Sequence, residues 1–166
     1  MLIGAYNPNL TTSALPVQRP GRILALDVGK KRIGLAVTDE LGITAQGLET
    51  LQRVRIREDL EKLRKLAKEL NVTTLVVGNP LHMSGRESKQ GEYTREFADR
   101  LSAHLSIPVV FWDERLTSAE AERLLRASGA SLTQRQRAVD RLSAVLLLES
   151  FLEHSRLRVA GGEPLA

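Results

Sequence analysis

Residues 21–39 constrain the fold more than any other stretch of the chain. Two apolar runs, 23–26 and 33–37, stand on either side of Asp27, Gly29 and three consecutive cations. Apolar runs of this length, separated by glycine and charge, predict two β-strands joined as a tight hairpin. A carboxylate at the end of a buried strand is costly unless another group compensates its charge, so Asp27 requires a partner.

The rest of the pattern predicts an α/β protein. Strands are expected over 22–28, 33–38, 44–51, 72–77 and 109–112, and helices over 55–70, 91–105, 117–129 and 134–154. Two Thr-x-x-Glu/Gln boxes, 117–120 and 133–136, predict where the last two helices begin. Right-handed crossovers then give a mixed five-stranded sheet with helices on both faces. A site is expected at the carboxyl ends of its parallel strands.

Composition excludes several classes of protein. The chain has 166 residues, enough for one domain, and no cysteine, which excludes disulfides, thiol catalysis and cysteine-ligated zinc. We expect a cytoplasmic protein, with neither a signal peptide nor a membrane span. Proline, glycine and small polar residues predict a flexible leader over 1–20 and a flexible tail over 156–166, around a domain of 21–155. The net charge of +4 permits a polyanionic partner without requiring one.

Acids from three separate segments are expected to meet at one edge of the sheet. Asp27 ends the first strand, Asp113 and Glu114 follow the last, and Asp140 heads an apolar stripe on the final helix. Clustered carboxylates repel one another, and their oxygen atoms are the ligands that Mg²⁺ or Mn²⁺ prefers. Two such ions about 3.5–4 Å apart can activate water and stabilise the leaving oxygen of a phosphodiester. The pattern therefore favours a metal-dependent hydrolase.

Simpler roles remain open for these residues. Asp27 could cap the hairpin turn, Asp140 could complement the helix dipole, and one of the neighbouring acids Asp113 and Glu114 could pair with Arg115. The cations near the expected site either contact phosphates or form an ordinary solvated surface; they are Lys30, Lys31, Arg32, Arg135, Arg137 and Arg141.

Four blocks in order resemble a known family. They are Asp27-Val-Gly29 with the hairpin to Asp39, Val76-Val-Gly78-Asn-Pro80 with Gly85, Asp113-Glu-Arg-Leu-Thr117, and the helix segment 139–148. Together they are similar to the signature blocks of the YqgF family, Holliday-junction-resolvase-like proteins of the ribonuclease H superfamily. The resemblance covers 21–154. Asn79, His82 and Ser143 depart from the family pattern.

The resemblance implies a ribonuclease H-like fold and metal-dependent endonuclease chemistry. It makes Asp27, Glu114 and Asp140 the catalytic metal ligands, with Asp113 as second choice for Glu114, and Mg²⁺ or Mn²⁺ the cofactor. Its expected substrate is the 5′ end of precursor 16S rRNA, in ribosome biogenesis, with branched DNA as the alternative. Arg86 and Arg115 then join the cations expected to hold nucleic acid.

Two other classes of protein fit parts of the pattern. Asp-x-Gly before a hairpin also resembles the phosphate-binding hairpin of actin-like and sugar-kinase ATPases, but those proteins need a second such lobe, for which this chain has no room. The second class is a non-catalytic nucleic-acid-binding or ribosome assembly factor. The aromatic fraction of 4% argues against a binder based mainly on base stacking. The sequence leaves a monomer and a homodimer equally open.

Overall fold

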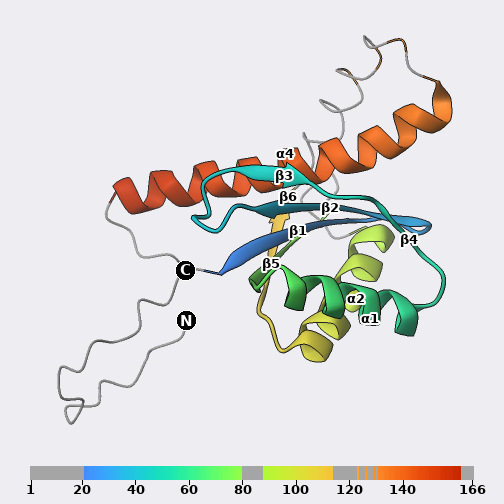
Figure 1. Ribbon diagram of the computed structural model, residues 1–166, viewed down its shortest axis with the longest axis horizontal. Coiled ribbons are helices and arrows are strands. Elements are labelled where there is room, and N and C mark those ends of the chain that lie inside the picture. Colours follow the sequence, from blue (N-terminus) through green and yellow to red (C-terminus); the bar gives the residue numbers. More distant parts are fainter. Residues whose placement is uncertain are drawn as a thin grey trace.

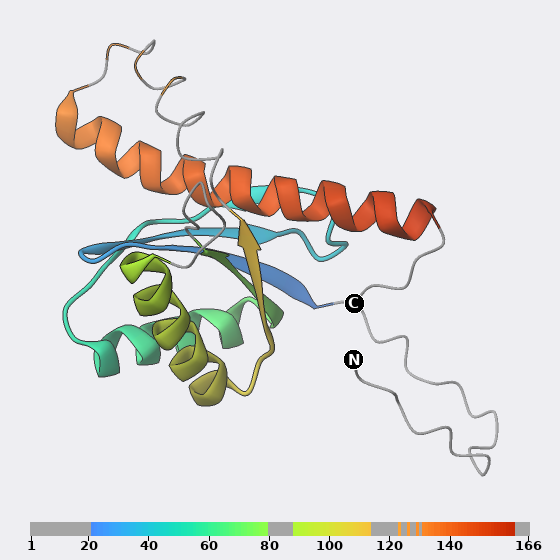
Figure 2. The ribbon, with the colours of Figure 1, turned by 180° about the vertical axis from the view of Figure 1, so that it is seen from behind.

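A single mixed β-sheet separates two helical layers. The computed structural model describes residues 21–79, 88–113 and 131–161 and the single positions 123, 126 and 129, except for the side chains of 136, 137, 158 and 159. Helices α1 (Ile56–Glu69) and α2 (Lys89–Leu105) cover one face of the sheet, and α4 (Leu132–Ala160) crosses the other (Figure 1, Figure 2). The predicted arrangement with helices on both faces is confirmed.

The sheet is mixed as expected, and β1 lies at its centre. Its strands are β1 (Arg22–Val28), β2 (Arg32–Thr38), β3 (Ala45–Gly47), β4 (Leu51–Gln52), β5 (Val72–Asn79) and β6 (Val109–Asp113). They run in the order β3-β2-β1-β5-β6, and β4 also pairs with β2. β1 is antiparallel to β2 and parallel to β5, which is parallel to β6. The carboxyl ends of β1, β5 and β6 therefore meet at one edge.

The prediction of a single strand over 44–51 is wrong. Two short strands, β3 and β4, replace it and pair with different parts of β2, so the sheet has six strands rather than five. Between them Leu48 still donates its N–H to the Leu35 carbonyl, at 2.9 Å, while its side chain packs against the core under α1 and α2. The four residues after Gly47, up to Leu51, then face three residues of β2, and this one extra residue lets Leu48 and Leu51 pack against the same core.

Each face of the sheet has its own hydrophobic core. Leu24, Leu26 and Val28 of β1 pack with α1 and α2, whereas Ala25 packs with α4. The predicted apolar stripe of α4 is present on that second side: its fully buried members are Ala144, Leu147 and Leu148, and Phe151 is partly buried against them. Within the described ranges, no helix has the length and apolarity needed to cross a membrane.

Serine caps fix where two helices begin. Ser88 Oγ accepts from the Gly91 N–H at 2.9 Å, so α2 begins at residue 89 rather than 91. Ser131 and Gln134 form the reciprocal bonds of a capping box, Ser131 N–H to Gln134 Oε1 at 3.3 Å and Gln134 N–H to Ser131 Oγ at 3.4 Å. The box predicted over 133–136 was therefore two residues too late.

Helix α4 is also longer than its sequence pattern indicated. It continues to residue 160, over positions that the sequence placed in the tail, and Arg156 near its end donates to the Ile43 carbonyl. The predicted helix over 117–129 falls almost entirely on residues outside the described ranges.

Candidate functional site

The side-chain alternation of β1 places Asp27 on the α4 face of the sheet. Leu26 and Val28 belong to the core under α1 and α2, so Asp27 between them shares the opposite face with Ala25. In the hairpin ladder Asp27 stands directly opposite Gly34 of β2. Asp27 thus sits on the central strand, near its carboxyl end, as the sequence predicted.

Helix α4 comes into backbone contact with the sheet at Gly34. A Cβ atom added to Gly34 would lie 2.2 Å from the backbone oxygen of Asp140. Asp140 therefore lies over the position opposite Asp27, and the two predicted acids share one face and one end of the sheet. A larger residue than glycine would push the helix, and Asp140 with it, away from β2.

Gly34→Ala tests this close approach. We expect the free energy of unfolding to fall by roughly 1–3 kcal/mol, because the added methyl group meets rigid backbone rather than a flexible side chain. Gly34→Ser should lower the free energy of unfolding by at least the same amount. Urea unfolding measures both variants, and unchanged midpoints would contradict the packing of α4 on β2.

The Asp140 carboxylate is paired with a cation. Arg32 Nε donates to Asp140 Oδ2 at 2.6 Å, and the two side chains are 24% and 20% exposed. Arg32 begins β2 on the same face as Gly34, since the two residues are two positions apart. The structure thus brings together Asp27, Asp140 and Arg32, a residue that the sequence proposed for phosphate contact.

Asp113, at the end of β6, does not join this group. Asp113 is in register with Asn79, and the residues two positions earlier, Phe111 and Val77, belong to the core under α1 and α2. The Asp113 position therefore lies on the face opposite Asp27. Glu114, Arg115 and Arg86 lie outside the described residues. Within the part of the chain that the structure describes, no three acids or histidines are grouped closely enough to hold a metal ion.

The remaining predicted cations are spread around the hairpin end and the start of α4. Lys30 and Lys31 are exposed in the β1–β2 turn. Arg141 is exposed on α4 and donates through Nε to the Leu48 carbonyl at 3.2 Å. Arg135 is half-buried in the first turn of α4, and the side chain of Arg137 is not described.

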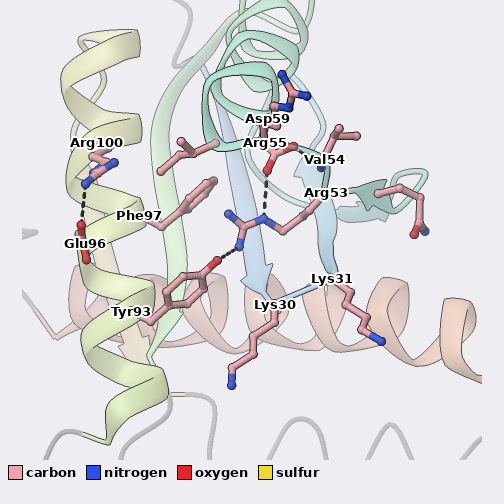
Figure 3. A pocket seen from close by; sticks show the side chains of 12 residues that line it. Lys30, Lys31, Arg53, Val54, Arg55, Asp59, Tyr93, Glu96, Phe97 and Arg100 are labelled. Carbon is pink, nitrogen blue, oxygen red and sulfur yellow. Dashed lines mark hydrogen bonds and ion pairs between the residues drawn. The ribbon is translucent and has the colours of Figure 1, made fainter.

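A cavity lies on the other side of the same turn. Its volume is about 650 Å³, and it is bounded by the hairpin turn, the segment before α1, and α2 (Figure 3). Its lining residues are Lys30, Lys31, Gln52, Arg53, Val54, Arg55, Ile56, Asp59, Tyr93, Glu96, Phe97 and Arg100. Of these residues, the sequence singled out only the two lysines.

Arg53 connects the three elements that bound this cavity. Its Nε donates to Asp59 Oδ2 at 3.1 Å, and its NH1 donates to the Tyr93 hydroxyl (Figure 3). The same NH1 donates to the Gly29 carbonyl at 3.0 Å. Its guanidinium carbon lies 4.7 Å from the centre of the Phe97 ring. Arg53 and Asp59 are only 9% and 1% exposed. A buried ion pair therefore ties the hairpin turn to both α1 and α2.

Comparison with known proteins gives a close sequence match. The family model RuvX, described as Holliday junction resolvase, matches residues 21–154. A protein of Koribacter versatilis is 53% identical over 146 residues, covering 88% of this chain and 94% of that protein. One of Syntrophus aciditrophicus is 48% identical over 132 residues, covering 80% and 88%. Both carry the name "Putative pre-16S rRNA nuclease".

Solved structures share the fold at low identity. The fowlpox virus resolvase in complex with Holliday junction DNA has a TM-score of 0.52 and 12% identity, covering 81% of this chain and 98% of that one. The T. thermophilus RuvC, in complex with a Holliday junction substrate, has a TM-score of 0.51 and 13% identity, covering 81% and 96%. The predicted ribonuclease H-like fold is confirmed.

Proposed function

This chain belongs to the RuvX family of Holliday junction resolvases, and we propose that it is a metal-dependent endonuclease acting on structured nucleic acid. The placement of Asp27 and Asp140 on one face at the carboxyl end of β1 carries the proposal. The names of its relatives favour the 5′ end of precursor 16S rRNA as substrate over branched DNA. We assign this activity to one domain, 21–155, of a cytoplasmic protein.

The chemistry of the donor set fits Mg²⁺ or Mn²⁺. Asp27 and Asp140 offer carboxylate oxygens, and Asp140 already attracts the guanidinium of Arg32, so a positive charge is favoured at this point. Asp27, Asp140 and Glu114 would hold the metal; the position of Asp113 on the other face favours Glu114 as the third ligand. Metal held by these carboxylates would lower the pKa of a water nucleophile and stabilise the leaving oxygen.

The chain's own residues orient the substrate and balance charge. Asp27 is held on a strand that is paired on both sides. Arg32 offsets the negative charge of Asp140 and reduces its repulsion with Asp27. The remaining predicted cations bind backbone phosphates, which positions a strand without reading its sequence: Lys30, Lys31, Arg86, Arg115, Arg135, Arg137 and Arg141.

One cleavage assay tests both the reaction and the substrate. Two labelled substrates are incubated with Mg²⁺, Mn²⁺ or a chelator: a 16S rRNA precursor with its 5′ extension and a four-way DNA junction. We expect metal-dependent cleavage that is faster on the RNA and absent with chelator. Cleavage that persists with chelator would contradict the metal mechanism, and faster cleavage of the junction would reverse the substrate preference.

A further inference from the structure

We propose that the cavity beside the β1–β2 turn binds a single nucleic-acid strand and forms a second substrate subsite. The cavity is lined by α2 and by the segment before α1, on the face of the sheet opposite α4, and Asp27 and Asp140 belong to the α4 side (Figure 3). This inference rests on the proposed action on nucleic acid, and it adds residues that the cleavage site does not use: Arg55, Tyr93 and Val54.

The cavity has a fixed floor. Arg53 is paired with Asp59, and its NH1 donates to the Gly29 carbonyl and the Tyr93 hydroxyl, so its guanidinium is held in place. The bond to Gly29 instead fixes the turn from which Lys30 and Lys31 project. Because these side chains are already ordered, a ligand that binds here would not lose affinity to the entropy cost of ordering them.

The rim of the cavity carries positive charge. Lys30, Lys31 and Arg55 line it and are exposed, and none of the three forms an ion pair with any residue that the structure describes. The fourth rim cation, Arg100, is paired with Glu96 at 2.7 Å. Three cations that have no ion pair with a described residue line one cavity, and they favour an anionic ligand.

Apolar groups are exposed beside these cations. Val54 is 63% exposed, Ile56 38% and Tyr93 36%, and all three line the same cavity. A nucleotide presents this combination of groups, since its phosphate pairs with cations while its base and sugar contact aromatic and apolar surface. A volume of about 650 Å³ accommodates a nucleotide or two rather than a duplex.

Continuity with the cleavage site indicates a strand rather than a free nucleotide. Lys30 lies three residues after Asp27 and lines the cavity, so the turn reaches from one site to the other. A strand that leaves Asp27 and Asp140 over the Lys30–Lys31 turn would enter the cavity directly. The cavity would then hold the single-stranded part of the substrate next to the cleaved bond.

Binding of a labelled single-stranded RNA of 12 nucleotides tests the subsite. Fluorescence anisotropy is measured with chelator present and in Asp27→Asn protein, so that no cleavage takes place. Adding Lys31→Ser and Arg55→Ser should weaken binding about tenfold and reduce the salt slope of log K by about 1.4, since each phosphate contact on a single strand contributes about 0.7. The matched control, Lys62→Ser with Lys65→Ser on exposed positions of α1, should leave both quantities unchanged.

A second pair of variants tests the contact with a base. Tyr93→Leu should weaken RNA binding about fivefold or more, and Tyr93→Phe, which keeps the ring, should retain it. Equal losses in the cavity and control variants, or competition by polyglutamate as strong as that by poly(U), would overturn the subsite. The test is independent of hydrolysis: an absence of cleavage by the wild type would refute the proposed reaction and leave the binding result standing.

Discussion

Asp27→Asn is expected to reduce cleavage more than about 100-fold while the protein stays folded. The amide has nearly the shape of the carboxylate but lacks its charge, so the proposed metal ions lose a ligand that sits on the central strand. Loss of a residue that merely orients a metal ligand costs roughly 10–100-fold in affinity or activity, and a direct ligand should cost more. Single-turnover cleavage with saturating Mn²⁺ measures the loss.

Asp39→Asn is the matched control for this substitution. Asp39 is also an acid at the end of a hairpin strand, and its Oδ1 accepts from the Ile43 N–H at 2.7 Å and the Thr44 N–H at 3.3 Å. Those bonds, led by the one from Ile43, lower the pKa of the Asp39 carboxyl. This control variant also loses one negative charge, but at a position outside the proposed metal site. It should therefore cleave the substrate at the wild-type rate. Equal cleavage by Asp27→Asn and wild type, in preparations free of other nucleases, would refute the metal site.

The approach of Asp27 and Asp140 was predictable because local patterns and topology agree there. The apolar run before Asp27 requires a buried strand, and the stripe below Asp140 requires a helix packed on the sheet. Right-handed crossovers then leave few arrangements of the strands. What no pattern indicated is how close α4 comes to β2: Gly34 admits the Asp140 backbone because glycine has no side chain.

Other features depend on register or on contacts between distant segments, and the sequence does not encode these locally. The face on which Asp113 lies follows from its pairing with Asn79. The sequence alone therefore could not show that Asp113 lies on the face opposite Asp27. The split of β3 from β4 depends on one extra residue in the pairing with β2, which lets Leu48 and Leu51 pack against the same core. Arg53 is buried only because Asp59 and the turn at Gly29 come together around it.

Asp59→Ala is expected to destabilise the protein by about 3–5 kcal/mol, the largest stability effect that we anticipate. Arg53 would remain buried without its counter-charge, and the Val54 N–H, which donates to Asp59 Oδ1 at 3.1 Å, would lose its acceptor. Urea unfolding at neutral pH, followed by circular dichroism, measures the change. A surface pair such as Arg100 and Glu96 should contribute less than about 1 kcal/mol when broken in the same way.

The double variant Arg53→Met/Asp59→Leu separates the cost of an unpaired charge from the value of the pair. Replacing both partners with apolar side chains removes two buried charges together, so most of the lost stability should return. The turn, however, would still lack the bond from Arg53 to the Gly29 carbonyl. We therefore expect the double variant to be stable and yet to bind single-stranded RNA less tightly than the wild type, because Lys30 and Lys31 are no longer held in place. A double variant as unstable as Asp59→Ala would show that the hydrogen bonds of this pair matter more than its charges.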